Sequence, residues 1–245
     1  MALINAKGIY YKDLNKKIKQ LINKGEKEII LKNVNGQRYL GDGIKDEVKL
    51  IIKGTPGNDM AAFAGGIQIE VEGNAQDAIA NTMNSGRVVV YGDAGDVLGY
   101  SMRGGEVYIK GRVGYRTGIH MKGFKEKQPT IIIGGTAGDF FGEYMAGGRL
   151  ILLGLNIKKE EPIIGNYIGA GMHGGIMYIR DQVEAYKTGL EVKVEIVSDE
   201  DRKELRRLLK DYCDIFDYNI DQIMDAEFSK LRPVSSRPYG NLYAY

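Results

Sequence analysis

Short apolar runs recur along the middle of the chain, and each is preceded by glycine-rich turns. The runs read IQIEV, RVVVY, EVYIK, RLILL and IMYIR, and their composition favours β-strands. The turns between them begin with glycine at a nearly constant spacing, in steps of 19, 19, 19, 24 and 19 residues. These glycines are Gly54, Gly73, Gly92, Gly111, Gly135 and Gly154. Because the longer step contains the insertion FKEKQP, the pattern predicts a repeat of about 19 residues.

A second column of bulky residues runs in phase with the turns. Its members are Phe63, Met83, Met102, Met121, Met145 and Met172. One unit cannot bury its own apolar face, but stacked units can, because the strand of each unit pairs with the next. Strands that run in the same direction form a parallel sheet with a spacing of ~4.8 Å, and the usual crossover is right-handed. The pattern predicts a mainly β fold, a right-handed parallel β-helix, and the six-residue period of left-handed helices is absent.

The two ends of the chain have helical periodicity instead. Leu14, Ile18, Leu21 and Ile22 mark an amphipathic helix that ends at NKG, and we expect it to cap the first coil. Near the other end, Ser198 and Asp201 have the spacing of a capping box. Two apolar stripes follow and predict two helices, one through Leu205, Leu208, Leu209, Tyr212 and Phe216, the other through Ile220, Ile223, Met224, Phe228 and Leu231.

The last residues, RPVSSRPYGNLYAY, have no periodicity and predict an extended arm, which we consider a candidate contact for a partner. We therefore divide the chain into two parts. Residues 1–197 form the β-helix with its N-terminal helix, and residues 198–245 form the helical tail and arm.

Composition and charge narrow the classes of function. The chain has 245 residues, and its 34 basic and 32 acidic side chains give a net charge of +2, which argues against a dedicated nucleic-acid binder. We find no apolar stretch of about 18 residues and no signal-peptide core, so we expect no membrane span and no secretion. The single cysteine, Cys213, suits a reducing cytoplasm, and its place on a helical stripe indicates a small core residue.

One segment, IGAGMHGGIMYIR, contains Gly169, Gly171 and Gly174 at the G-x-G-x-x-G spacing of a dinucleotide-binding loop. That function needs a helix to begin within the loop, because the helix N-terminus binds the pyrophosphate. Here the third glycine leads into a strand-like run, so we interpret these glycines as turn residues. His120 and His173 each adjoin a methionine of the column, and no further zinc-ligand spacing accompanies them.

Acidic residues at one turn position suggest a candidate site for metal binding or catalysis. Asp77, Asp96 and Asp139 share this position, which Asn58, Tyr115 and Lys158 occupy in other coils. Acids stacked ~5 Å apart could bind calcium or act on sugars in a β-helix enzyme. The alternative is that they hydrogen-bond backbone groups of the turns, as Asp and Asn often do. We favour this alternative because only Asp77 and Asp96 form an adjacent acid pair.

One further charged pair follows from the same register. Arg87 and Glu106 both come just after the small residues of their coils, and we expect a cross-coil ion pair worth under ~1 kcal/mol. The chain by itself shows no catalytic, cofactor-binding or metal-binding set of residues.

Four segments together carry a family resemblance. They are GTPGNDMAAFAGGIQIEVEGNAQD, GDFFGEYMAGGRLILLG, IGAGMHGGIMYIRD and the closing SDEDRKELRRLL. The second contains Glu143-Tyr144-Met145 followed by Gly147-Gly148. These segments resemble the GXGXG domain that ends the large, or alpha, subunit of glutamate synthase, and the resemblance covers roughly residues 10–235.

The resemblance implies a right-handed β-helix that acts as a non-catalytic scaffold. In the family, one domain hydrolyses glutamine, and ammonia travels to an FMN and iron–sulfur synthase domain that converts 2-oxoglutarate to glutamate. The β-helix carries none of those cofactors. We therefore expect a split enzyme in which this chain binds glutaminase-type and FMN/iron–sulfur subunits, and we also consider a homo-oligomer.

Two alternative functions stay open. The β-helical component of formylmethanofuran dehydrogenase shares the GXGXG β-helix, although the helical tail and the Glu143-Tyr144-Met145 segment favour glutamate synthase. A polysaccharide-acting β-helix enzyme that uses Asp77 and Asp96 is the other alternative.

Overall fold

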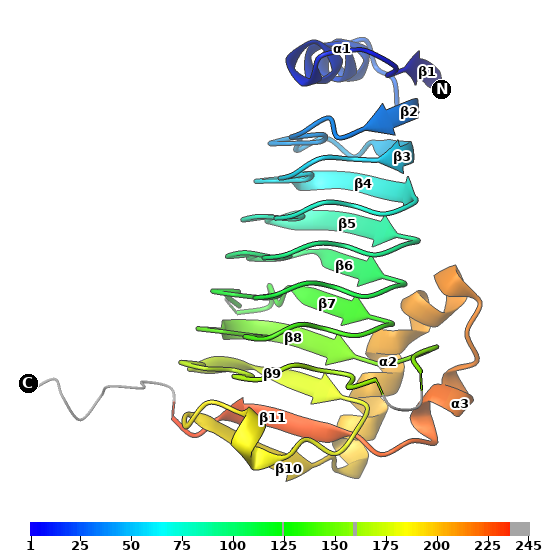
Figure 1. Ribbon diagram of the computed structural model, residues 1–245. Helices are drawn as coiled ribbons and strands as arrows, with labels where there is room; N and C mark the ends of the chain where they lie inside the picture. The colour runs from blue at the N-terminus through cyan, green and yellow to red at the C-terminus, as the bar shows by residue number, and fades with distance from the viewer. Residues whose placement is uncertain (124, 159–160, 236–245) are drawn as a thin grey trace, which may run out of the picture.

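The computed structural model describes residues 1–123, 125–158 and 161–235, and these residues form a β-solenoid of stacked coils (Figure 1). Nine strands follow one another along the stack: β1 (Ala2–Asn5), β2 (Glu28–Asn35), β3 (Lys49–Thr55), β4 (Gly65–Glu72), β5 (Ser85–Val90), β6 (Glu106–Ile109), β7 (Thr130–Ile133), β8 (Ala146–Leu152) and β9 (Gly174–Ile179). Each pairs in parallel with the next. The prediction of a mainly β fold with a stacked parallel sheet is confirmed.

Alternate strand residues point into the solenoid and stack on their counterparts in the next coil. In register, Leu50, Ile69, Val88, Val107, Ile131, Leu150 and Met177 form one such column, and all are fully or almost fully buried. The regular step of 19 residues keeps this column apolar, because each coil returns the same sequence position to the same place.

Overlapping turns form the other side of each coil, and every second residue in them has positive φ. Three columns share this conformation, and they are Tyr39, Asp59, Ala78, Val97, Arg116, Phe140 and Tyr167; Gly41, Ala61, Ala80, Gly99, Gly118, Gly142 and Gly169; and Gly43, Phe63, Thr82, Ser101, His120, Tyr144 and Gly171. The N–H groups of successive positive-φ residues bond to opposite neighbours: Val97 N donates to Tyr115 O (2.8 Å) in the next coil, and Gly99 N donates to Ile79 O (2.8 Å) in the previous one.

The predicted column of bulky core residues is correct for its methionines and wrong for Phe63. Met83, Met102, Met121, Met145 and Met172 are fully buried, whereas Phe63 is 56% exposed. The core position of its coil is occupied by the buried Ala64. The error arises because the pairing of β4 with β5 shifts its register between Gly65 and Gln68. Counting back two residues from the glycine pair of this coil therefore reaches Phe63, one residue before the core position.

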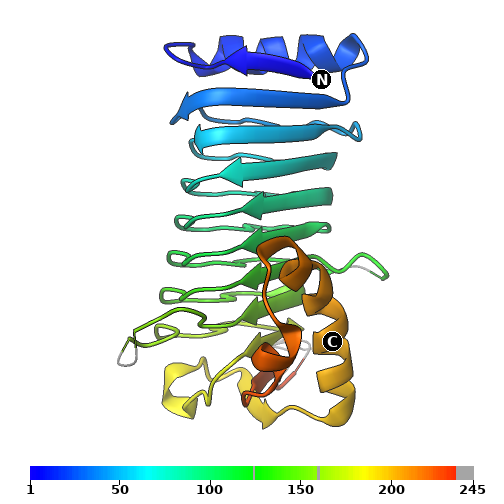
Figure 2. The same cartoon turned by 90° about the vertical axis from the view of Figure 1, so that its right-hand side faces the viewer.

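The N-terminal end of the solenoid lies under helix α1 (Tyr11–Asn23), which covers the first coils (Figures 1 and 2). Leu14 and Ile18 of this helix are buried in the same apolar cluster as the inward residues of β2 and β3. The short strand β1, which our sequence analysis did not predict, precedes the helix and pairs with β2.

Two further strands, paired antiparallel, follow β9 at the C-terminal end. The order β9-β11-β10 places β11 (Ser229–Pro233) between β9 and β10 (Val192–Ile196). The predicted second tail helix is therefore too long: α3 spans only Ile220–Met224, and Leu231 belongs to β11 because its buried side chain continues the core. Most of the predicted arm, residues 236–245, lies outside the described residues.

Helix α2 (Asp199–Phe216) packs on the outer face of the later strands, as Figure 2 shows. The outward residues Val89, Tyr108, Ile132, Ile151 and Tyr178 form a second apolar cluster with Leu205, Leu209 and Tyr212 of the helix. These strands read as continuous apolar runs because both faces are covered.

A short 3-10 helix, η1 (Ala185–Lys187), precedes β10. Within the described residues, no helix combines the length and apolarity that crossing a bilayer requires.

Candidate functional site

The aspartates singled out in the sequence form a ladder between coils. Asp77 Oδ1 accepts the backbone N–H of Asp96 (2.9 Å), Asp96 Oδ1 accepts that of Tyr115 (2.8 Å), and Asp139 Oδ1 accepts that of Asn166 (2.7 Å). The interpretation as backbone-bonding side chains is confirmed, with one difference: the bonded groups belong to the next coil and not to the local turn. Asn74 and Asp93 make a parallel ladder nearby.

A glycine directly precedes each residue that donates to this ladder. A Cβ at Gly95, Gly114 or Gly165 would overlap the carboxylate oxygen of the coil before it. The placement of Lys158 in this column is wrong, because an insertion after Gly154 delays the turn and Asn166 takes the position, 27 residues after Asp139. The aspartate supplies the hydrogen bond between neighbouring coils, and the glycine allows the close approach that this bond needs.

Two substitutions at Asp96 test whether the ladder is structural. We expect Asp96→Ala to lower the free energy of unfolding by ~1 kcal/mol, because the N–H of Tyr115 loses its acceptor. Asp96→Asn keeps an oxygen in place, so we expect a change below ~0.5 kcal/mol. Urea denaturation of both variants measures the difference, and equal destabilisation by the two would show that the hydrogen bond contributes nothing.

The glycines that resemble a dinucleotide-binding loop are turn residues of the solenoid. Gly169 and Gly171 have φ of +65° and +70° and belong to two of the positive-φ columns. Gly174 begins strand β9, so no helix starts at this loop to bind a pyrophosphate. The segment therefore lacks the element on which dinucleotide recognition depends.

The two histidines lie on the surface of the turns. The His120 ring stacks on Tyr144, with centroids 5.2 Å apart, and His173 Nδ1 lies 3.3 Å from the carbonyl oxygen of Gly171. In the described part of the chain, no three His, Cys, Asp or Glu side chains come together as a metal site would need.

An aromatic surface covers the turn side of coils in the second half of the solenoid, and sequence analysis missed it. Tyr100 and Tyr144 flank His120, and Tyr167 stacks on Phe140 (4.8 Å). Next to them, Arg116 lies over the Phe140 ring and pairs with Glu143 (2.6 Å), whose side chain is buried. We call these seven residues the aromatic surface. Exposed aromatic rings around an arginine are the composition favoured at the centre of protein interfaces.

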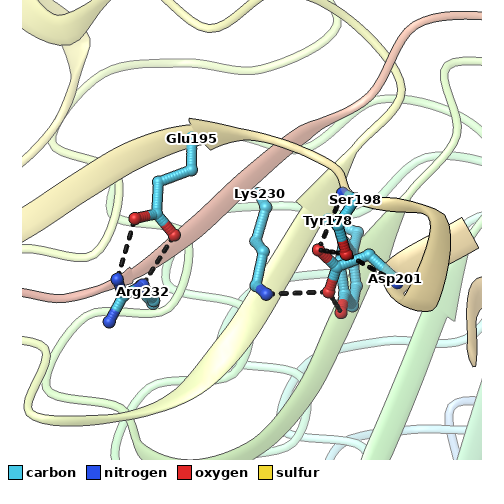
Figure 3. A network of polar contacts seen from close by, with 6 residues as sticks. All are labelled: Tyr178, Glu195, Ser198, Asp201, Lys230 and Arg232. Carbon is cyan, nitrogen blue, oxygen red and sulfur yellow. Dashed lines mark hydrogen bonds and ion pairs between the residues drawn. The ribbon is translucent and has the colours of Figure 1, made fainter.

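A polar network joins the helical tail to the last coils (Figure 3). The buried carboxylate of Asp201 accepts hydrogen bonds from Tyr178 Oη (2.9 Å), from Lys230 Nζ (2.7 Å) and from the backbone N–H of Ser198 (3.0 Å). Burial alone would raise the pKa of Asp201, but these hydrogen bonds outweigh it, and the pKa is lowered. The Ser198–Asp201 capping box is present as predicted, and the network connects β9, α2 and β11.

The remaining candidates also serve the fold. Arg87 pairs with Glu106 (2.7 Å) as predicted, and it also pairs with Asp211 of α2 (2.6 Å), a partner that sequence spacing could not reveal. Cys213 lies on the buried side of α2, and burial raises the pKa of its thiol to about 11, so the thiol stays protonated at neutral pH.

Comparisons with known proteins agree with this architecture. The GXGXG motif family matches residues 12–234. The chain is also 42% identical to Uncharacterized protein MJ1350 of Methanocaldococcus jannaschii, over 98% of this chain and 95% of the relative. Both matches span the solenoid together with its tail. The chain belongs to the GXGXG motif family, whose known context is glutamate synthase.

Proposed function

We propose that this chain is a non-catalytic scaffold subunit of a glutamate synthase, which positions a glutaminase-type protein and an FMN/iron–sulfur synthase-type protein. The observation that carries the proposal is the extent of the family match, which runs through every coil from residue 12 to residue 234. The stacked-coil construction also supports it, because a rod held by main-chain ladders keeps a constant distance between proteins bound along it.

The use of the acidic side chains supports a structural role as well. Asp77 and Asp96 each commit an oxygen to the backbone of the next coil, and Asp201 is saturated by hydrogen bonds. A polysaccharide-acting enzyme would need the first two carboxylates directed at a sugar. Their positions in the ladder argue against that alternative.

The donor set of this chain does not fit an iron–sulfur cluster. Such clusters are held mainly by several cysteine thiolates, whereas this sequence has one cysteine, and its thiol is buried and protonated. In our proposal the FMN and the cluster therefore reside on the partner subunits, and this chain contributes no step of the chemistry.

The aromatic surface is the contact that we assign to a partner. Its residues belong to the turns, and none of them is in the apolar cluster that α2 covers, so we expect that a protein bound there would not compete with the tail. Stacked tyrosine and phenylalanine rings offer large contact area at a low cost in side-chain entropy.

Co-purification tests the proposal. We expect the tagged chain, isolated from its native cells, to retain glutaminase-type and FMN/iron–sulfur proteins, and we expect the chain alone to show no turnover with glutamine and 2-oxoglutarate. The double variant Tyr144→Ala and Tyr167→Ala should lose at least one partner, whereas Tyr10→Ala, an exposed tyrosine near α1, should retain both.

The identity of the retained proteins decides between the alternatives. A molybdenum or tungsten enzyme would replace the proposal with the formylmethanofuran dehydrogenase alternative. Recovery of neither kind of partner would contradict the scaffold function.

A further inference from the structure

Strand β10 is the outermost strand at the C-terminal end of the described sheet, since the order there is β9-β11-β10. An edge strand presents N–H and C=O groups that another chain can pair with. Large apolar side chains are also exposed at this end: Ile196 is 91% exposed and Leu190 is 97% exposed. The question is which molecule fits this edge.

The backbone register shows which residues face the open edge. In β10, Lys193 lies opposite Arg232 of β11 and Glu195 lies opposite Lys230. Val234 N donates to Glu191 O (2.8 Å), and hydrogen-bonding residues alternate along an antiparallel ladder. Glu191, Lys193 and Glu195 therefore direct their backbone groups at β11. Val192, Val194 and Ile196 direct theirs at the opposite edge, where the N–H of Val192 already donates to Gly189 O of the same chain (3.1 Å).

The sequence of β10, VKVEI, is complementary to itself in an antiparallel pair. If two copies pair with Val194 opposite Val194, Lys193 of one lies opposite Glu195 of the other, and Val192 lies opposite Ile196. Opposite charges that face each other across a strand pair are favourable, and like charges are unfavourable. The neighbouring registers that preserve the edge-facing residues are centred on Lys193 or Glu195, and they set like charges against each other. Of these three registers, only the one centred on Val194 sets opposite charges against each other.

Within one chain, Lys193 has a cationic neighbour on the β11 side. It lies opposite Arg232, and both cations share the carboxylate of Glu195, at 2.7 Å and 2.6 Å. Hydrogen bonds from Arg232 and Lys193 lower the pKa of Glu195 to about 2, so this carboxylate is ionised at neutral pH. A second copy would supply a further carboxylate on the open side of Lys193.

We propose that two copies of this chain form a two-fold symmetric dimer through antiparallel pairing of β10, centred on Val194. The pair joins the two sheets into one and covers Ile196 with Val192 of the other copy. Such an interface is isologous and closes after two copies, so it does not lead to filaments. This dimer is independent of the proposed scaffold function.

Charge reversal tests the dimer directly. On size-exclusion chromatography with light scattering, we expect the purified full-length chain to have twice the 27.2 kDa mass of one chain. Lys193→Glu and Glu195→Lys should each be monomeric, because each places like charges opposite one another at both pairs. An equimolar mixture of the two variants should recover the dimer mass, since the mixed pair again sets opposite charges against each other.

Two further variants keep the test decisive. Lys32→Glu makes the same charge change at an exposed position of β2 within the sheet, and it should remain dimeric. Val194→Pro removes an N–H that faces the edge and leaves the bonds to β11 intact, so it should be monomeric and folded. Circular dichroism checks the fold of every variant. A monomeric wild-type chain, or a dimer that survives both Lys193→Glu and Val194→Pro, would overturn the proposal and leave the scaffold function untouched.

Discussion

We expect Gly54→Ala to lower the free energy of unfolding by roughly 3 kcal/mol, because two physical costs coincide at this residue. Gly54 has φ of +127°, a backbone conformation outside the left-handed region that other residues adopt. A Cβ at this position would also overlap the carbonyl oxygen of Val34 in the preceding coil. That oxygen is backbone and cannot move without separating β2 from β3.

Gly43→Ala is the matched control. Gly43 also has positive φ, +66°, but a Cβ there would meet no atom within 4 Å. We expect it to cost only ~1 kcal/mol, the usual penalty of the left-handed region for alanine. Urea denaturation with a common m-value compares the two variants. Equal losses of stability would mean that the close contact between coils at Gly54 adds nothing to the free-energy cost of the substitution.

We expect Asp201→Ala to lower the free energy of unfolding by about 3 kcal/mol. The substitution leaves the Lys230 ammonium and the buried Tyr178 hydroxyl without their shared acceptor, and it removes the hydrogen bond that the Asp201 side chain accepts from Ser198 N in the capping box of α2. Asp199→Ala, at an exposed position of the same helical turn, should cost less than ~1 kcal/mol. Thermal and urea unfolding measure both variants.

The same carboxylate predicts a dependence on pH. Because the pKa of Asp201 is lowered in the folded protein, its contribution to stability is complete above the unfolded value of about 3.9 and is lost as the pH falls through the folded value. We expect the unfolding free energy of the wild type to fall more steeply below about pH 4 than that of Asp201→Asn. Parallel curves for the two proteins would contradict the assigned role of Asp201.

The repeat made most of the fold predictable from sequence. The glycine steps and the methionine column specify coil length and the core position, since both repeat wherever the chain returns to the same place. Phe63 shows the limit of this reasoning. A one-residue register shift beside Gly65 exchanges a core position with a surface position, and both alanine and phenylalanine are compatible with the sequence pattern. Strand β11 was missed because Leu231, the one aliphatic residue of SKLRP, also fits the helical stripe that precedes it.

The surface features were less predictable. The aspartate column was visible in the spacing, but its bonding to the next coil depends on a glycine–aspartate contact that exists only after stacking. The aromatic surface combines residues from two turn columns, such as His120 and Phe140, with residues outside these columns, such as Tyr100, so no single spacing links them. The partnership of Arg87 with Asp211 joins positions 124 residues apart, which no local pattern encodes.

The equivalence of Gly54 and Gly73 in successive turns has a consequence for the length of the molecule. Removal of residues 55–73 would join Gly54 to Asn74, so each turn and strand position in the shortened chain would still follow its usual neighbour. The rod would then be shorter by one strand spacing, ~4.8 Å. The length of such a solenoid is a whole number of coils, so loss or gain of repeats changes the distance between its two ends in steps of one strand spacing.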